Sequence, residues 1–92
     1  MELKEKVYYE VIGKYGEEAQ LDMAIEEMSE LTKEICKAKR GEHNHDAIVE
    51  ELADVLITLD QLQIICNINS KELADIKFKK VERLEERLKR VN

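Results

Sequence analysis

The chain has 92 residues, without proline and with only three glycines, and 39% of its residues are charged. This length predicts a single domain, residues 1–92, and the abundance of aliphatic, Glu and Lys residues predicts an all-α fold. The formal net charge of −6 argues against a general nucleic-acid-binding surface. The charged N-terminus does not resemble a signal peptide, and no apolar run is long enough for a membrane span. We therefore expect a soluble cytoplasmic protein in which the isolated Cys36 and Cys66 are free thiols.

Hydrophobic periodicity predicts four helices, and glycines mark the ends of the first two. The first helix is expected over about residues 2–12, where Gly13 and Gly16 end it. The second helix is expected over about residues 17–40, because its apolar residues recur in one stripe at helical spacing. Gly41 follows directly and is well placed to stop this helix.

Polar residues mark the starts of the third and fourth helices. Asp46 is the expected N-cap of the third helix, which continues to about residue 66. Asn69, with Glu72 three positions later, resembles a capping box at the start of the fourth. The short loop between the second and third helices makes them antiparallel neighbours. We therefore predict an antiparallel helical bundle of about four helices.

The third helix is apolar over more than half of its circumference. One stripe is expected to pack within its own subunit, and it consists of Val49, Leu52, Val55, Leu56, Leu59 and Leu62. Ile57, Ile64 and Ile65 lie outside that stripe. A helix with apolar residues on both sides is buried from two directions, and in so small a domain the second direction is expected to be another subunit. The sequence therefore predicts a homodimer or homotetramer.

Two copies of one acidic pattern stand 24 positions apart, at residues 26–31 and 50–55. In the first copy Glu27 and Glu30 are three residues apart, and in the second Glu51 and Asp54 are, so each pair shares one helical edge. If Met28 and Leu52 centre the facing apolar stripes, both acidic edges lie on the same side and at the same height. The carboxylates should then converge on a hard divalent cation, for which Mg²⁺ is the first candidate and Mn²⁺ the second.

The alternative is that these acids are only a solvated surface, because glutamate on a helix is usually exposed. Like-charge pairs four residues apart, such as Glu26 with Glu30, destabilise a helix by about 0.2–0.5 kcal/mol each. Residues 41–70 contain no Lys or Arg to offset the acids, and Asp54 stands within an apolar run. A bound cation resolves both problems. The competing functional interpretation is a non-catalytic interaction module that uses the acids as a docking surface.

The motif Glu26-Glu27-x-x-Glu30 followed by Glu51-x-x-Asp54 resembles the EExxE…ExxD signature of the MazG-like all-alpha nucleoside triphosphate pyrophosphohydrolases. The resemblance covers roughly residues 13–90. It implies Mg²⁺-dependent hydrolysis of an NTP or dNTP to the monophosphate and pyrophosphate, by a dimer or a dimer of dimers. It also implies that Glu27, Glu30, Glu51 and Asp54 are the metal ligands. Either Glu26 or Glu30 could accept the proton of the attacking water.

The same resemblance indicates residues that contact the substrate. Gln20 precedes the first acidic motif within the similar region. Family members often have Asn-x-Lys-Phe in the last helix, and here Asp75 replaces the Asn while Lys77 is retained. This departure leaves the sugar and base contacts of Asp75 open. Lys77 and Lys80 are candidates for phosphate contact, with a solvated helix surface as the alternative, and a partner subunit could supply them.

Overall fold

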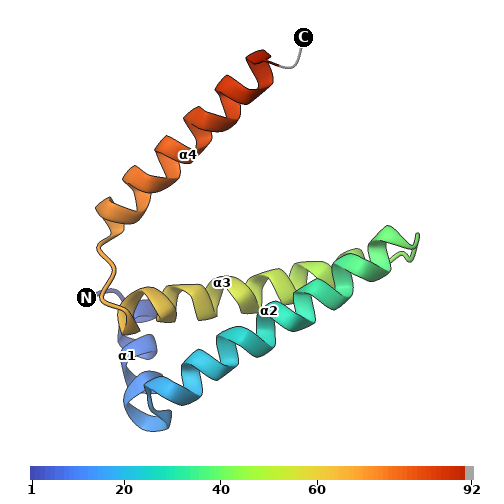
Figure 1. The fold of residues 1–92 in the computed structure, drawn as a ribbon. Helices are drawn as coiled ribbons and strands as arrows, with labels where there is room; N and C mark the ends of the chain where they lie inside the picture. Colours follow the sequence, from blue (N-terminus) through green and yellow to red (C-terminus); the bar gives the residue numbers. More distant parts are fainter. Residues whose placement is uncertain (91–92) are drawn as a thin grey trace.

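The computed structural model describes residues 1–90, which form four helices joined by short loops (Figure 1). The all-α prediction is confirmed, and strands are absent from this range. The helices are α1 (Leu3–Tyr15), α2 (Glu17–Lys39), α3 (His45–Ile65) and α4 (Ser70–Arg90). The molecule is elongated, with principal extents of 53 × 36 × 22 Å.

Glycines end the first two helices, although one predicted end is wrong. Gly13 lies inside α1, which continues to Tyr15, because a glycine within a helix costs only about 1 kcal/mol. Gly16 ends α1 at a φ of 94°, a conformation that favours glycine, and its N–H donates to Ile12 O at 2.8 Å. Gly41 has a φ of 89° just after α2. These two positive-φ positions are therefore occupied by the residue that adopts them without strain, and the third positive-φ position of the described chain is Asn67, at a φ of 53°, after α3.

The start of α3 differs from the prediction. Asp46 is not the N-cap, since α3 begins at His45 and Asn44 occupies the cap position. The Asn44 side chain makes no cap bond; instead its Nδ2 donates to Glu34 O at 2.9 Å and to Glu34 Oε1 at 3.0 Å. This pair ties the end of α2 to the start of α3. The prediction for α4 is confirmed in part: Asn69 Oδ1 accepts a bond from the Lys71 N–H at 2.7 Å and caps the helix, but in the described chain the Glu72 side chain makes no bond that would complete a capping box.

α2 and α3 lie side by side as an antiparallel hairpin, as predicted (Figure 1). Their facing sides, however, are not centred on Met28 and Leu52, which are 40% and 45% exposed. The buried apolar residues of the two helices are instead Ala24 and Val55, at 2% and 6% exposed. The small Ala24 side chain lets the two helices approach closely at this point. Each helix is therefore rotated so that its acidic edge turns toward the other helix.

This rotation changes which apolar residues of α3 are covered. The prediction that Val49, Leu52, Leu56 and Leu59 pack within the subunit is wrong, because all four are exposed. Ile64 and Ile65, which were assigned to the outer side, are half-buried. The exposed large apolar residues of α3 are Val49, Leu52, Leu56, Ile57 and Leu59. The hairpin thus keeps an extensive apolar surface that a single chain does not cover.

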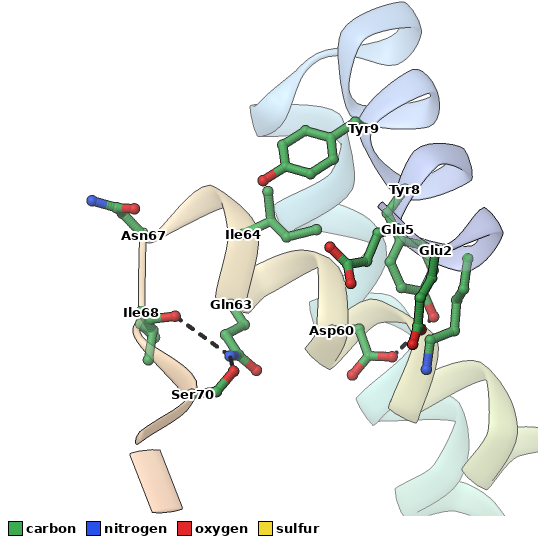
Figure 2. A pocket seen from close by; sticks show the side chains of 11 residues that line it. Glu2, Glu5, Tyr8, Tyr9, Asp60, Gln63, Ile64, Asn67, Ile68 and Ser70 are labelled. Atoms are coloured by element: carbon green, nitrogen blue, oxygen red, sulfur yellow. Dashed lines mark hydrogen bonds between the residues drawn. The ribbon is translucent and has the colours of Figure 1, made fainter. Parts of the chain in front are cut away.

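α1 crosses the end of the hairpin. Tyr8 is buried there, and its hydroxyl donates to Asp60 Oδ2 at 2.9 Å. Both residues line a cavity between α1, the end of α3 and the segment before α4 (Figure 2). The volume of this cavity is about 370 Å³. Gln63 Nε2 donates to Ser70 Oγ at 2.8 Å and to Ile68 O at 3.4 Å, which fixes that segment against α3.

α4 leads away from the hairpin, and none of its residues is buried (Figure 1). It nevertheless has a strongly apolar side, which consists of Leu73, Ile76, Val81, Leu84 and Leu88, all exposed. Within one chain this stripe therefore covers neither α2 nor α3. In residues 1–90, no helix combines the length and the apolar character that crossing a membrane requires.

Candidate metal centre

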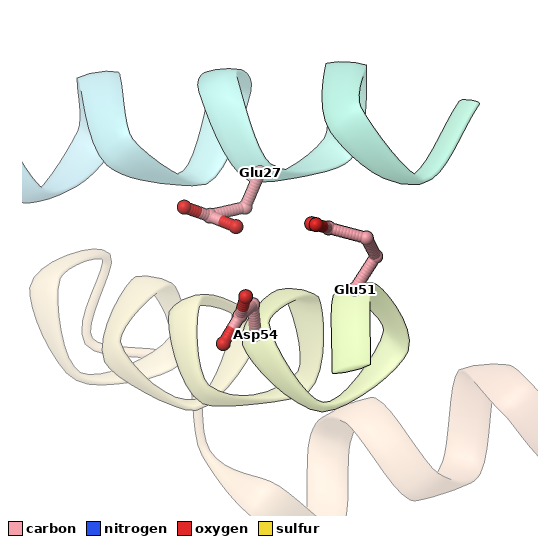
Figure 3. A group of neighbouring side chains, drawn as sticks. All are labelled: Glu27, Glu51 and Asp54. Carbon is pink, nitrogen blue, oxygen red and sulfur yellow. The ribbon is translucent and has the colours of Figure 1, made fainter. Parts of the chain in front are cut away.

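Three carboxylates meet between α2 and α3 (Figure 3). Glu27 comes from α2, and Glu51 and Asp54 come from adjacent turns of α3. One oxygen of each lies within 4.8 Å of one oxygen of both others. Glu27 and Glu51 are half-buried and Asp54 is exposed, so the group opens to solvent on one side. The rotation of the hairpin causes this convergence, because it places Glu27 and Glu51 in the helix interface.

The electrostatics of this group are unfavourable without a cation. Burial, followed by the charges of Asp54 and Glu51, raises the pKa of Glu27 above its ordinary value. Burial, followed by the charges of Asp54 and Glu30, likewise raises the pKa of Glu51. No basic side chain within residues 1–90 forms an ion pair with any of the three carboxylates. The negative charges are therefore balanced by nothing in the described chain.

One atom indicates where a cation would bind. Glu51 Oε2 is buried and accepts no hydrogen bond from the rest of the described chain. A buried carboxylate oxygen without a partner is costly, and buried polar atoms in folded proteins nearly always have one. The candidate metal-ligand atoms of the cluster are all carboxylate oxygens, which suit Mg²⁺, Ca²⁺ or Mn²⁺ rather than softer metals. The residues present therefore fit a hard divalent cation.

The structure brings together three of the four predicted ligands and places Glu30 beside them. Glu30 is exposed and does not share the close oxygen contacts, yet its charge contributes to the raised pKa of both Glu27 and Glu51. Glu26 is also exposed, and its charge acts on Glu27. Both acids thus lie at the solvent side of the cluster, near enough to interact with it electrostatically.

A second cavity, of about 190 Å³, adjoins the carboxylates. Its lining consists of Gln20, Met23, Glu27, Asp54, Ile57, Thr58 and Gln61. Gln20, a predicted substrate residue, therefore shares a cavity with two of the predicted ligands, and its Nε2 donates to Gln61 Oε1 at 2.6 Å. Sequence reasoning missed Gln61 and Thr58. The available signal was their spacing from Asp54, which places a polar residue every three or four positions on one side of α3.

The remaining predicted substrate residues are distant from this centre within one chain. Asp75, Lys77 and Lys80 are exposed on α4, which points away from the hairpin (Figure 1). Asp75 is engaged locally, since its Oδ2 lies 3.2 Å from the Nζ of Lys71. The structure of a single chain does not bring these residues to the carboxylates.

Comparison with known families matches residues 15–91 to the model of the MazG nucleotide pyrophosphohydrolase domain. Because this match covers most of the chain, including all of α2 and α3, the chain belongs to that family. The three converging carboxylates are consistent with the divalent-metal dependence that is general among MazG-family enzymes. Searches of curated proteins and of solved structures returned no match.

Proposed function

We propose that this protein is a Mg²⁺-dependent nucleoside triphosphate pyrophosphohydrolase, which converts an NTP or dNTP to the monophosphate and pyrophosphate. The observation that supports it most is the convergence of Glu27, Glu51 and Asp54, with Glu51 Oε2 buried and unpaired, in a chain of the MazG family. The acids of an interaction surface would have no reason to turn inward between two helices at an electrostatic cost.

In this proposal Glu27, Glu51 and Asp54 hold the cation, and Glu30 joins them from the solvent side. Bound Mg²⁺, or Mn²⁺ in its place, supplies positive charge that neutralises the triphosphate and polarises a phosphoryl oxygen. The open side of the cluster, where Asp54 is exposed, is the side from which the phosphates approach.

The chain itself supplies the base. Glu26 and Glu30 are exposed acids beside the cluster, so either can accept the proton of a water that attacks the α-phosphorus. A bond forms between the water oxygen and the α-phosphorus, and the bond from that phosphorus to the bridging oxygen breaks. The electron pair leaves with pyrophosphate, which is the second product.

We further propose that the active form is a homodimer, or a tetramer of two such dimers. The exposed apolar surfaces of α4 and of the α2–α3 hairpin favour association, since each large apolar side chain contributes about 1.5–3 kcal/mol when fully buried. Charge favours the same contact, because residues 1–70 have a net charge of −9 and residues 71–92 a net charge of +3. In such a dimer, Lys77 and Lys80 of one copy contact the phosphates bound by the other.

We place this activity in the cytoplasm, with nucleotides rather than nucleic acids as ligands. Residues 1–70, which include the carboxylate cluster, have a net charge of −9 and therefore disfavour the binding of a polyanion that is not accompanied by bound cations. Cys36 and Cys66 are free and exposed, as suits a reducing compartment.

The test is to incubate the purified protein with each NTP and dNTP and Mg²⁺, and to resolve the products. We expect the nucleoside monophosphate and pyrophosphate, and no turnover after chelation of the metal. Formation of a nucleoside diphosphate and orthophosphate, or no turnover of any nucleotide, would contradict the proposal. Calorimetry separates it from the interaction module, which need not bind Mg²⁺ or Mn²⁺.

A further inference from the structure

Two glutamines lie at one end of the cavity that adjoins the carboxylates. Gln20 precedes Glu27 by seven residues on α2, and Gln61 follows Asp54 by seven residues on the antiparallel α3. At a rise of 1.5 Å per residue, both glutamines lie about 10 Å along the hairpin from the acids, and in the same direction. This separation is comparable to the distance between the phosphates and the base of a nucleotide.

The two amides are only partly satisfied by each other. Gln20 Nε2 donates to Gln61 Oε1 at 2.6 Å, and neither Gln61 Nε2 nor Gln20 Oε1 bonds to another described residue. Gln61 is only 5% exposed, yet it lines the cavity. A primary amide has donors as well as an acceptor, so a ligand in the cavity can use the donor that this bond leaves free on Gln61 and the acceptor that it leaves free on Gln20. The pair therefore presents one unused donor and one unused acceptor at this end of the cavity.

The rest of this end is suited to a flat ring. Met23 and Ile57 supply apolar walls, and both remain partly exposed. Thr58 offers nothing further to a ligand, because its hydroxyl already donates to Val55 O at 2.8 Å. A nucleobase has apolar faces and an edge on which an acceptor and a donor are adjacent. The apolar walls of the cavity match the faces of the base, and the free amide donor and acceptor match its edge.

We propose that Gln61, held by Gln20, determines which base the enzyme accepts. Gln61 Nε2 donates to an acceptor on the edge of the base, and Gln20 Oε1 accepts from the neighbouring donor. The proposal rests on the proposed function, since it takes the phosphates to be bound at the carboxylates. This inference goes beyond the proposed function by assigning base selection to Gln61, a residue on α3 that plays no part in holding the cation.

The test measures binding separately from turnover. Calorimetry with Mg²⁺ gives the Kd of non-hydrolysable α,β-methylene analogues of the ribo- and deoxyribonucleotides of each base, and of inorganic tripolyphosphate, which has no base. The variant is Gln61→Leu, which removes the amide but keeps most of the volume. The matched control is Gln63→Leu on the same helix, because Gln63 bonds to Ile68 O and Ser70 Oγ outside this cavity.

We expect the wild-type Kd to depend on the base, and Gln61→Leu to weaken the preferred nucleotide about tenfold, which removes the preference. Tripolyphosphate affinity should stay the same, and Gln63→Leu should retain the wild-type preference. If Gln61→Leu does not fold, Gln20→Leu serves instead with the same expected loss, because it removes the partner amide.

Three results would overturn the proposal: a wild-type Kd that is independent of the base, a preference that survives the variant, or a change only between ribose and deoxyribose. The binding data decide this question alone. A wild-type protein that binds nucleotides with base preference but never hydrolyses them would refute the proposed function and leave this inference standing. Hydrolysis of nucleotides, together with a preference in binding that Gln61→Leu leaves intact, would support the proposed function and overturn this inference.

Discussion

At the scale of single residues, Glu51 is the side chain on which the metal site depends most. It is the member of the cluster with a buried, unpaired oxygen and with a raised pKa. Glu51→Gln keeps the shape of the side chain, removes one ligand charge and relieves repulsion in the metal-free protein. We therefore expect loss of turnover without loss of fold, and a metal-free stability equal to or above that of the wild type.

Thermal unfolding with and without Mg²⁺ measures this. At a Mg²⁺ concentration a hundredfold above its Kd, the wild type should gain about 2.7 kcal/mol in the free energy of unfolding, and Glu51→Gln much less. Glu86→Gln, a change of the same kind on the exposed surface of α4, should respond like the wild type. An unfolded Glu51→Gln variant, or one with near-normal turnover, would show that the ligand assignment is wrong.

The same carboxylates predict an unusual dependence of stability on pH. Folding raises the pKa of Glu27 and Glu51, so the folded state binds protons more tightly than the unfolded state at these positions. Their contribution to the free energy of unfolding therefore falls as the pH rises from the ordinary glutamate range through their raised pKa values. Glu34 acts in the opposite sense, because its bonds to Asn44 and Lys37 lower its pKa.

Urea unfolding of the metal-free protein over a pH series isolates this effect when the wild type is compared with Glu51→Gln. The stability of the variant relative to the wild type should increase as the pH rises through that range. In saturating Mg²⁺ the wild type should instead be the more stable of the two. A difference between the two proteins that does not change with pH would exclude repulsion in the cluster as its cause.

At the scale of the elements, we expect the small, buried Ala24 to set how closely α2 and α3 approach. It is almost fully buried where the two helices meet. Ala24→Leu should force the helices apart, lower the free energy of unfolding by about 1–3 kcal/mol and weaken the stabilisation by Mg²⁺. Ala19→Leu, an exposed position on the same helix, is the control and should change neither quantity. Equal effects of the two variants would mean that this contact does not position the carboxylates.

The helices themselves could be predicted from the sequence, since apolar periodicity and Gly16, Gly41 and Asn69 mark them within a few residues. The rotation of α2 against α3 could not. Periodicity located the apolar stripes around Met28 and Leu52, but a stripe that packs on another helix and one left exposed look alike in a sequence. The prediction that the paired acids converge survived this error because both helices are rotated in the sense that turns their acidic edges toward each other, which places Glu27 and Glu51 in the helix interface. Gln61 was missed because its one signal, the helical spacing from Asp54, does not distinguish a buried amide from a solvated one.

At the scale of the whole molecule, the uncovered apolar surfaces predict association. α4 exposes an apolar stripe along its length, and the hairpin exposes another on α3. Leu84→Glu with Leu88→Glu should prevent their contact and yield a monomer near 10.8 kDa by light scattering, whereas the wild type should be twice or four times that mass. Glu82→Lys, a charge change on the same helix, is the control, and its assembly should have the same number of subunits as that of the wild type. A wild-type protein that remains a folded monomer at micromolar concentration would contradict the assembly.

The most direct measurement of the central claim is hydrolysis of a nucleoside triphosphate in ¹⁸O-labelled water with Mg²⁺, followed by mass spectrometry of both products. Attack of water at the α-phosphorus places the label in the nucleoside monophosphate and leaves the pyrophosphate unlabelled, and we expect this pattern with the wild type and no products with Glu51→Gln. Label in pyrophosphate or orthophosphate, or unlabelled monophosphate, would contradict the account.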